Sequence, residues 1–490
     1  TLVVLRGDGG SEVWSSPGWN GGGGIAMADV DGDGITDIVG FGADGTVRAV
    51  DATGRVLWSG GRVTTTYPQA TVADLDGDGN PEVIADTQVL NGSTGALLFT
   101  LPINASIPYR LPAVADLDQN GTQEIILGNS VFSSTGQLMW TSPVRGSYGH
   151  WAAVLDTDGD PQAEVAMVGG GQLAIHDHDG TQKVLTSAGG TQPGAPCVAD
   201  FDGDGQAEIA WGSSSTLNMY ETDGRQRWGA SVDDSSGLAS CSGYDIDGDG
   251  AYEVLFADQN TFHIFDGTTG VLLYSQGGHA SGTLWEYPSV ADLDNDGSAE
   301  IVITSNNYYL GGWSGVTVFG HNGDGWMKSG NTWHTHDYAV TNILADGSVP
   351  ARPEPWWQTY NVYRARPAVD SAATDLQVRI TDVCYVGCED DNLVQVAVQV
   401  LNTGGVDVPA GVPVSIYGNS GGVYTLIGTQ TLAEPVPSGR ALESIEVNFR
   451  KDQVGTDGFL IRVDDDGSGT GPHVECDEAN NEATYNDPPC

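Results

Sequence analysis

Basic side chains are scarce in this chain of 490 residues. It holds 18 Lys and Arg residues against 65 Asp and Glu residues, so its formal net charge at pH 7 is −47. An excess of carboxylates on this scale repels phosphate backbones and anionic lipid surfaces, which argues against nucleic acid and membrane surfaces as partners. Long apolar runs are also missing, since none approaches the roughly 20 residues that cross a bilayer, and we expect no membrane insertion.

Cysteine is rare as well, with six residues at positions 197, 241, 384, 388, 476 and 490. An even count without zinc-type CxxC pairs favours disulfides in an oxidising compartment. Cys197 and Cys241 could instead be buried thiols, and the four C-terminal cysteines allow three pairings between which the sequence does not choose. Thr1 is not preceded by a charged and then apolar leader, so we expect that any signal peptide has been removed. The expected location is secreted, extracellular or at the cell surface.

Glycine and tryptophan are plentiful. The 70 Gly and 22 Pro residues, with only 17% charged residues, favour a turn-rich all-β protein. The 13 Trp residues and a hydrophobic fraction of 39% argue against disorder despite the acidity. A chain of this length exceeds one hydrophobic core, so at least two domains are expected.

One nine-residue pattern, close to DxDGDGxxE, occurs seven times. Its copies begin at positions 29, 74, 116, 156, 200, 245 and 292, a spacing of 40 to 47 residues, and together they hold 27 of the 65 acidic residues. This period is the size of one four-stranded propeller blade. β-type residues follow each copy, as in EVIAD and EIILG, so the pattern lies between strands and is not an EF-hand.

The spacing within the pattern predicts calcium binding. Ca²⁺ takes six to eight oxygens from a flexible loop, and acids at positions 1, 3, 5 and 9 with a backbone carbonyl at position 7 supply them, while glycine at position 6 makes the bend. A single DGDG run could be an ordinary polar turn, but seven copies in register with the closing acid favour metal sites. We predict about seven calcium ions. The predicted ligands are Asp29, Asp31, Asp33, Ile35 and Asp37; Asp74, Asp76, Asp78, Asn80 and Glu82; Asp116, Asp118, Asn120, Thr122 and Glu124; Asp156, Asp158, Asp160, Gln162 and Glu164; Asp200, Asp202, Asp204, Gln206 and Glu208; Asp245, Asp247, Asp249, Ala251 and Glu253; Asp292, Asp294, Asp296, Ser298 and Glu300.

The copies are unequal. The third has Asn120 in place of an aspartate, and the first closes with the shorter Asp37. The fourth has Pro161 where the others have the bend glycine, and proline cannot take a positive φ. We therefore expect the Asp156 loop to be the weakest or to stay empty.

Short apolar segments precede the loops and polar-turn hairpins follow them, as in VRAVDATGRVLW and LNMYETDGRQRW. With these loops, residues 1–366 resemble the FG-GAP/VCBS repeat family, which includes the calcium-bearing propellers of integrin α subunits. The resemblance implies a calcium-binding β-propeller whose partners dock away from the metal loops.

Closure of the ring has two interpretations. The N-terminal hairpin LVVLRGDGGSEVWSS has no loop before it, and YAVTNILADGSV and TYNVYRAR near residues 338–366 read as degenerate inner strands. Together they predict an eighth, calcium-free blade that leaves no exposed edge. The alternative is seven blades, with residues 330–366 as an interdomain arm.

A second domain is predicted for residues 367–490. Alternating segments at 375–383, 393–402, 412–418, 424–432, 444–449 and 459–466, separated by Gly and Pro turns, indicate a β-sandwich. The ECDEANN segment and its surroundings, about residues 370–487, resemble a CARDB domain, a bacterial immunoglobulin-like adhesion module. The fold class is thus all-β, a propeller followed by a sandwich.

Two further clusters were considered. His334, His336 and Asp337 could form part of a transition-metal site, but a third firm ligand is not evident and hydrogen bonding is favoured. Trp356, Trp357, Tyr360 and Tyr363 could stack on sugars, but packing between blades is favoured.

No nucleophile elbow, HExxH or phosphate-binding glycine loop is present in the sequence. We therefore expect a calcium-binding bacterial adhesion or assembly protein and not an enzyme. Its expected partners are a protein or glycan on the cell surface or in the matrix, or further copies of itself assembled head to tail into filaments. The alternatives are a polysaccharide-binding lectin and a polysaccharide lyase.

Overall fold

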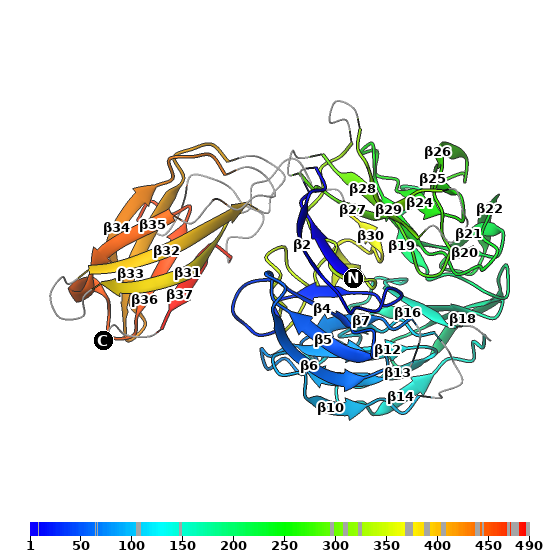
Figure 1. Cartoon of the computed structure of the whole chain (residues 1–490), viewed down its shortest axis with the longest axis horizontal. Helices are drawn as coiled ribbons and strands as arrows, with labels where there is room; N and C mark the ends of the chain where they lie inside the picture. Colours follow the sequence, from blue (N-terminus) through cyan, green and yellow to red (C-terminus); the bar gives the residue numbers. More distant parts are fainter. Residues whose placement is uncertain are drawn as a thin grey trace.

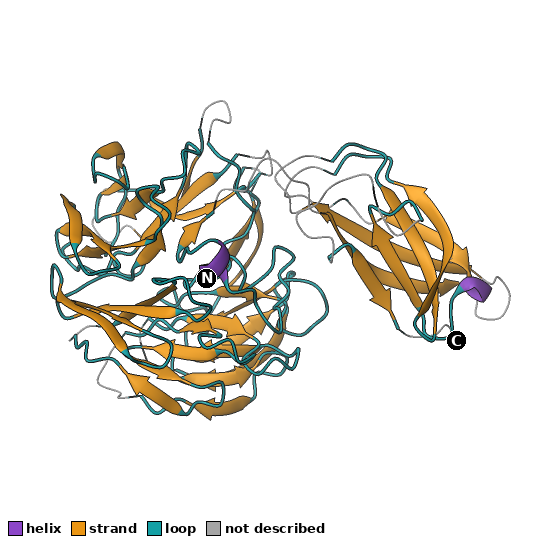
Figure 2. Ribbon diagram, turned by 180° about the vertical axis from the view of Figure 1, so that it is seen from behind, coloured by secondary structure: helices purple, strands orange, loops and turns teal. Residues whose placement is uncertain are grey.

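The computed structural model describes residues 1–490 except 8, 64, 66, 104–108, 147–148, 295–297, 307–311, 322–325, 368–375, 387–392, 403–407, 437–441, 443–444, 468–470, 472–479 and 487–490, and it leaves out the side chains of residues 382 and 384–386. Strands dominate throughout (Figure 2). Among these residues no helix is long and apolar enough to cross a membrane.

Seven antiparallel sheets, here sheets 1 to 7, each contain one acidic loop, here loops 1 to 7. Among the described residues, sheets 1 to 5 have four strands in simple order, sheet 6 has the same four and a fifth strand beside its inner strand, and sheet 7 has three. The strands are β3 (Ala26–Ala28), β4 (Asp37–Phe41), β5 (Thr46–Val50) and β6 (Val56–Arg62); β7 (Ala70–Ala73), β8 (Glu82–Ala85), β9 (Gln88–Asn91) and β10 (Leu97–Thr100); β11 (Ala113–Ala115), β12 (Glu124–Leu127), β13 (Ser130–Phe132) and β14 (Leu138–Thr141); β15 (Trp151–Leu155), β16 (Glu164–Gly169), β17 (Gln172–His176) and β18 (Gln182–Ser187); β19 (Cys197–Ala199), β20 (Glu208–Ser213), β21 (Thr216–Glu221) and β22 (Gln226–Ser231); β23 (Cys241–Tyr244), β24 (Glu253–Ala257), β25 (Thr261–Phe265) and β26 (Leu272–Gly277); β27 (Ser289–Ala291), β28 (Glu300–Asn306) and β29 (Ser314–Phe319).

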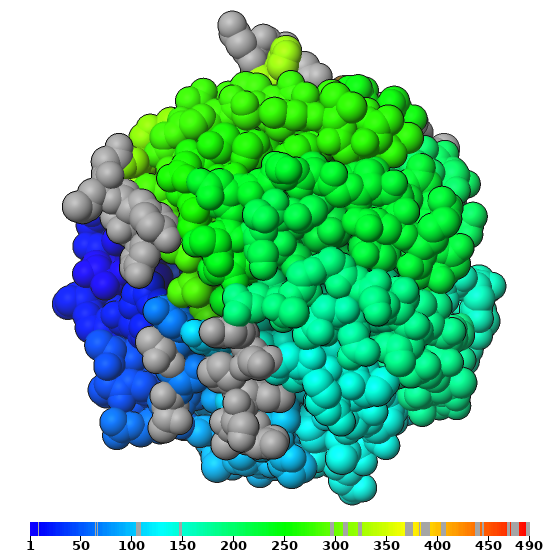
Figure 3. All heavy atoms as spheres, turned by 90° about the vertical axis from the view of Figure 1, so that its right-hand side faces the viewer, coloured from blue at the N-terminus to red at the C-terminus, as the bar shows by residue number. Residues whose placement is uncertain are grey.

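The sheets are arranged as propeller blades. The first strands of sheets 1 to 6 contact one another in turn, which places them around the centre. Strands such as β8 and β16 are buried at every residue because neighbouring sheets cover both faces, whereas the outer strand β18 alternates between exposed and half-buried residues. Seen face-on, the colours of the chain run in order around a round outline (Figure 3).

Tryptophans link neighbouring sheets at the rim. The indole N–H of Trp58, on the outer strand of sheet 1, donates to the carbonyl of Gly92 in the outer turn of sheet 2 at 2.5 Å. The same bond recurs twice further round, and it also joins the N-terminal hairpin of β1 (Leu2–Leu5) and β2 (Glu12–Ser16) to sheet 1. The bonds are Trp14 to Ala52, Trp140 to His178 and Trp228 to Gly267, at 2.7–2.9 Å.

The predicted eighth blade is wrong in one half. The hairpin β1–β2 does occupy the position of an outer hairpin ahead of sheet 1, since Trp14 makes the same bond as Trp58. The segment that was expected to complete it pairs elsewhere. Its strand β30 (Ala365–Arg366) runs parallel to β23 of sheet 6, so β1–β2 is a two-stranded sheet on its own. The reason is burial, because Tyr363 and Ala365 are fully covered beside the inner strands.

Residues 327–366, here the central segment, line the inner strands of the ring. The segment contains the helix α1 (Trp356–Thr359), whose two tryptophans are buried. Polar and backbone contacts join the central segment to each of sheets 1 to 7. It is therefore neither an eighth blade nor a free interdomain arm. The contacts, in order of sheet, are Met27 with His334, Thr71 with Asp337, Pro112 with His336, Asp156 with Asn361, Val198 with Tyr363, Gly243 with Ala365, and Asp292 with Gly330.

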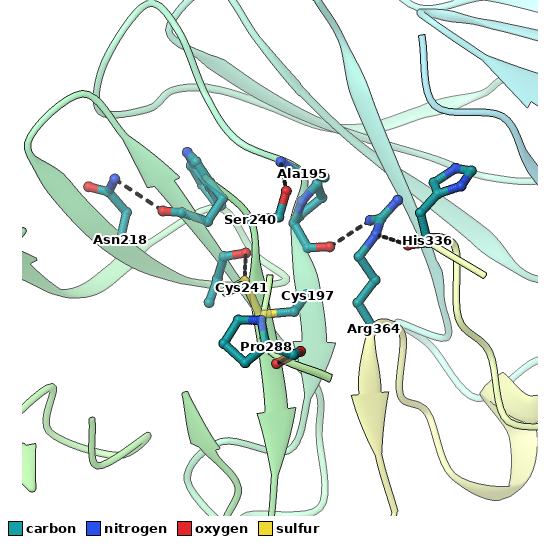
Figure 4. Close-up of a disulfide and its surroundings, with 12 residues drawn as sticks. Ala195, Cys197, Asn218, Ser240, Cys241, Pro288, His336 and Arg364 are labelled. Carbon is teal, nitrogen blue, oxygen red and sulfur yellow. Dashed lines mark hydrogen bonds between the residues drawn. A yellow bond between two sulfur atoms is a disulfide. The ribbon is translucent and has the colours of Figure 1, made fainter. Parts of the chain in front are cut away.

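A fully buried arginine secures the end of the central segment. Arg364 donates to the carbonyl oxygen of His336 at 2.8 Å (Figure 4). It also donates to the carbonyl oxygens of Pro196 at 2.8 Å and Ala152 at 3.2 Å. Its φ of 47° lies in the left-handed region, where a residue with a side chain is strained. The carbonyls pair three of the guanidinium's five N–H donors, which offsets part of the cost of burying the side chain.

The two histidines of the central segment are held by hydrogen bonds. His334 Nε2 pairs with Asn342 Oδ1 at 2.8 Å, and His336 Nε2 pairs with the carbonyl of Pro112 at 3.0 Å. Burial lowers the pKa of each imidazole to about 4, although the nearby Asp337 opposes the shift. Both rings are therefore neutral in the folded protein at pH 7.

We expect the stability of the protein to fall on acidification through these rings. The unfolded chain protonates histidine near pH 6.5 and the folded chain near pH 4, so the unfolded state binds more protons in between. Stability is then lost as pH falls from 6.5 to 4, at up to about 1.4 kcal/mol per pH unit for each histidine. His336→Gln keeps a donor for Pro112 and should flatten the dependence of Tm on pH in this window. Parallel Tm profiles for parent and variant would contradict this.

A disulfide links sheets 5 and 6 near the centre. Cys197 and Cys241 begin the inner strands β19 and β23, their Cα atoms are 5.6 Å apart, and their sulfurs are bonded (Figure 4). Of the two interpretations of this pair, the disulfide is confirmed. The other four cysteines lie at positions whose side chains are outside the described residues.

We expect removal of this disulfide to destabilise the ring. The bond closes a separation of 44 residues, for which the chain-entropy estimate is about 4 kcal/mol. Cys197→Ala with Cys241→Ala should therefore lower Tm by about 10 °C. The measurement is calorimetric melting of the double variant beside the parent, and equal Tm values would show that the ring does not rely on the bond.

The C-terminal strands form two facing sheets. One has the order β31 (Leu376–Val386), β32 (Leu393–Asn402) and β35 (Ile445–Arg450), and the other β34 (Val423–Thr431), β33 (Pro413–Ser420), β36 (Phe459–Val463) and β37 (Glu482–Tyr485). A one-turn 3-10 helix, η1 (Lys451–Gln453), follows β35. Alternate residues of β32 are buried in a core of Val, Ile and Phe side chains. The six predicted strands are confirmed, and β37 was not predicted. In Figure 1 these sheets lie to one side of the propeller.

Candidate metal loops

Each acidic loop joins the first two strands of its sheet. The position-1 aspartate directly follows the inner strand, and the position-9 acid is the first residue of the second strand, in all seven sheets. In sheet 1, for example, Asp29 follows β3 and Asp37 begins β4. The ladder therefore fixes both ends of the loop, and the residues between them have to turn within a short span.

The position-1 carboxylate organises the turn. In loop 1 the N–H groups of Gly32 and Gly34 donate to Asp29 Oδ1 and Oδ2, both at 2.8 Å, and the N–H of Ile35 donates to Asp33 Oδ1 at 2.8 Å. The bond from the position-6 glycine recurs in loops 2, 3, 5 and 6. These five glycines have φ between 85° and 92°, which accounts for the residue type at that position.

One oxygen of the position-9 acid is held by the backbone. The backbone N–H of the position-2 residue donates to it in every loop, at 2.7–3.1 Å. The second oxygen of Asp37 and of Glu208 is buried and makes no hydrogen bond within the described residues. A buried carboxylate oxygen without a donor is costly, so this atom needs a positive partner.

Burial and mutual repulsion raise the pKa values of these acids. Burial raises the pKa of Glu82 and of Glu253 to about 7, and the neighbouring loop aspartates raise it further. Burial also raises the pKa of Glu124 and of Glu208 to about 8, with repulsion from the position-3 aspartate adding to it. Burial likewise raises the pKa of Asp37 to about 7. A positive charge beside these acids would lower their pKa values again.

The acids converge closely enough to share an ion. Carboxylate oxygens from three acids lie within 4.8 Å of one another in loops 1 to 5, and two more such groups exist among the described residues. Asp29, Asp31 and Asp33 form the group in loop 1, while Asp116, Asp118 and Glu124 form it in loop 3. An all-oxygen set of this kind suits a hard cation. Three of the predicted acids thus come together in each of loops 1 to 5, whereas the full ligand sets stay a prediction and Asp296 of loop 7 lies outside the described residues.

Two cationic side chains lie beside these loops, and the sequence analysis did not predict them. Lys183 Nζ lies 2.8 Å from Asp158 Oδ2 and also hydrogen-bonds Glu164 Oε1 in loop 4. In loop 5, Arg227 Nη1 lies 2.5 Å from Asp202 Oδ2 and 2.7 Å from Glu221 Oε1. Each residue comes 19 positions after the closing acid, so only an alignment of the outer hairpins could have revealed it.

Comparison with known proteins supports a repeat β-propeller. The FG-GAP-like repeat family matches residues 156–211 and 245–303. No curated protein matches the chain. Among solved structures, the biofilm matrix protein Bap1 of V. cholerae is similar with a TM-score of 0.62 and 18% identity, over 73% of this chain and 88% of that one. Rhamnogalacturonan lyase YesW (TM-score 0.42, 18% identity, 65% and 74% covered) and BamB from Moraxella catarrhalis (0.42, 16%, 64% and 89%) are less similar. The CARDB resemblance stays a prediction.

Proposed function

We propose that this chain is a secreted or cell-surface bacterial adhesion or assembly protein, with a calcium-stabilised propeller at 1–366 and a sandwich at 367–490. It binds a protein or glycan of the surface or matrix and does not act as an enzyme. Head-to-tail self-assembly remains a finer prediction within this proposal.

The observation that carries the proposal is the carboxylate at the start of each second strand, which is buried in sheets 1 to 6. It has one oxygen bonded to the backbone, and in loops 1 and 5 the other is buried without a hydrogen bond among the described residues. Ca²⁺ at these loops would supply the missing charge through Asp and Glu oxygens, with the backbone carbonyl at position 7 as a further ligand. The turn itself is held by hydrogen bonds within the loop, as from Gly32 and Gly34 to Asp29 in loop 1.

Location and role rest on further support. The Cys197–Cys241 disulfide suits an oxidising compartment. The likeness of the fold to a biofilm matrix protein favours a matrix role over the others considered. Rigid, ion-locked blades suit a protein that has to present a fixed binding surface outside the cell, where Ca²⁺ is plentiful.

The calcium part is tested by melting. We expect excess Ca²⁺ to raise Tm relative to EDTA by about 10 °C or more, because each saturated site contributes about 2.7 kcal/mol at a hundredfold excess over its Kd. Mg²⁺ should have a smaller effect since it prefers a tighter octahedral shell. A Tm that is the same in EDTA and in Ca²⁺ would contradict the proposal.

A single substitution sharpens this test. Glu82→Gln should lower the number of bound Ca²⁺ ions by one, measured by native mass spectrometry, and lower Tm in Ca²⁺. In EDTA the same variant should melt at or above the parent's Tm, because it removes one buried carboxylate from a repelling group. The matched control is Glu12→Gln on the exposed strand β2, which should change neither value.

Glycan binding is favoured by an aromatic cluster on the other side of the ring. Tyr67, Tyr109 and Trp285 lie on loops that join the outer strand of one sheet to the inner strand of the next. Antiparallel order places these loops opposite the metal loops. Ring centroids are 4.9 Å apart for Tyr109 and Trp285 and 5.2 Å for Tyr67 and Trp285, and all three rings are half-buried. Such rings can stack on sugars.

We expect Trp285→Ala to abolish, or to weaken at least tenfold, any glycan binding that the parent shows on an array of matrix polysaccharides. The control is Tyr424→Ala, which removes an exposed ring from β34 of the sandwich. Equal loss in both variants, or unchanged binding in Trp285→Ala, would place the glycan site elsewhere.

A further inference from the structure

Loop 4 differs from its neighbours in how its turn is held. In loops 1, 2, 3, 5 and 6 the position-6 glycine donates its N–H to the second oxygen of the position-1 aspartate. Pro161 has no N–H to donate and cannot adopt the φ of 85–92° that those glycines have. Asp156 therefore keeps only the bonds to Oδ1, from the N–H groups of Asp158 and Gly159.

An ammonium group lies among the acids of this loop. Lys183 Nζ is 2.8 Å from Asp158 Oδ2 at position 3, hydrogen-bonds Glu164 Oε1 at position 9, and is 3.9 Å from Asp177 Oδ2. The Glu164 oxygen that receives Lys183 is the equivalent of the Glu208 oxygen that has no hydrogen bond in loop 5. The position-9 acid of loop 4 thus already has its positive partner.

The fold directs this side chain to the loop. Lys183 lies at the β-bulge between β17 and β18, where the register shifts between Ile175 and His176. The same bulge occurs in the outer hairpins of sheets 1, 2, 3, 5 and 6. Its residue there is Leu57, Leu98, Met139, Arg227 and Leu273, respectively.

Sheet 6 shows what the bulge residue faces. Leu273 lines a cavity of about 440 Å³ together with Asp247 and Glu253, the position-3 and position-9 acids of loop 6. A side chain at the bulge therefore points toward these two acids. Where it is Leu or Met it brings no charge, and where it is Lys it can reach both.

Arg227, the bulge residue of sheet 5, reaches only one of the two acids of its loop. Its guanidinium contacts Asp202 at position 3 and Glu221 of the hairpin, but no bond from it to Glu208 is formed, and Glu208 Oε1 stays without a donor in the described residues. Loop 5 also keeps Gly205 with the usual φ of 88°. Loop 5 therefore retains the features of a metal loop, whereas loop 4 has lost the glycine and filled the position of the charge.

We propose that the ammonium of Lys183 replaces the metal ion in loop 4, so that this blade is locked by the chain itself while its neighbours are locked by Ca²⁺. The statement about the neighbours rests on the proposed function; the role of Lys183 in loop 4 does not. Sheet 4 then stays ordered in the absence of metal and separates the ion-dependent sheets on its two sides.

The test compares three substitutions at the bulge. Lys183→Met, which copies Met139 of sheet 3, should lower Tm in EDTA by about 5 °C because the acids of loop 4 lose their counter-charge. Lys183→Arg should keep part of the parent's Tm in EDTA, because an arginine at this bulge contacts the position-3 acid, as Arg227 does in sheet 5, but makes no bond to the position-9 acid there. The reciprocal variant Met139→Lys should reduce the number of bound Ca²⁺ ions by one, measured by native mass spectrometry.

A double variant that restores the usual residues of a metal loop to loop 4 tests the proposal by the number of bound Ca²⁺ ions. Lys183→Met combined with Pro161→Gly should bind one more Ca²⁺ than the parent and should recover its Tm when Ca²⁺ is added. An unchanged Tm for Lys183→Met in EDTA, or an unchanged ion count in the double variant of a parent that does bind Ca²⁺, would overturn the proposal. If the parent binds no Ca²⁺, the proposed calcium role fails, while the loss of Tm in Lys183→Met and its rescue by Lys183→Arg still test the role of Lys183.

Discussion

Carboxylates held close together repel one another, and loops 1 to 5 of this propeller each hold three of them within 4.8 Å of one another. The sheet ladder leaves no freedom to relieve the repulsion, because the position-1 and position-9 acids directly flank strands whose residues are buried. Each loop therefore needs a cation near the same point. Loop 4 has Lys183 there, and loop 5 has Arg227 close by. The remaining loops have a leucine or methionine at the equivalent bulge where it is described. The charged side chain beside the loop thus differs from sheet to sheet, although the bulge that carries it recurs.

The centre of the ring depends on a different kind of interaction. The central segment has few regular backbone pairs, and its place is set by buried polar side chains that find carbonyl partners. Arg364 serves three carbonyls and His336 one, while Thr71 and Thr335 both donate to Asp337. Such a segment is specific because each buried donor would be costly if it were displaced. These buried contacts also explain why the last residues of the propeller, up to Arg366, do not complete the blade begun by β1 and β2.

Much of the fold could be predicted from the sequence, because the nine-residue pattern occurs seven times, once in each sheet. The 40–47-residue period located every sheet, and the closing acids marked the first residue of each second strand. The alternating residues of 393–402 likewise located β32. Sequence did not reveal the course of residues 327–366, because this segment has no period and its partners lie far away in the chain, 266 positions for Thr71 and Asp337. Lys183 escaped notice for a related reason: a bulge brings it to loop 4 from a hairpin whose pattern looks ordinary. Pro161 did signal that loop 4 is different, but not what takes the place of the ion.

The rim bond between an indole and the next outer turn has a consequence for how such a ring can grow. Trp58 carries the donor for the following sheet, and its own outer turn, at Ala52, accepts from Trp14 of the preceding hairpin. One repeat thus contains both halves of the joint. A tandem duplication of the encoding segment would deliver a unit that already fits its neighbour on each side, so the lineage could have lengthened the ring without inventing a new interface.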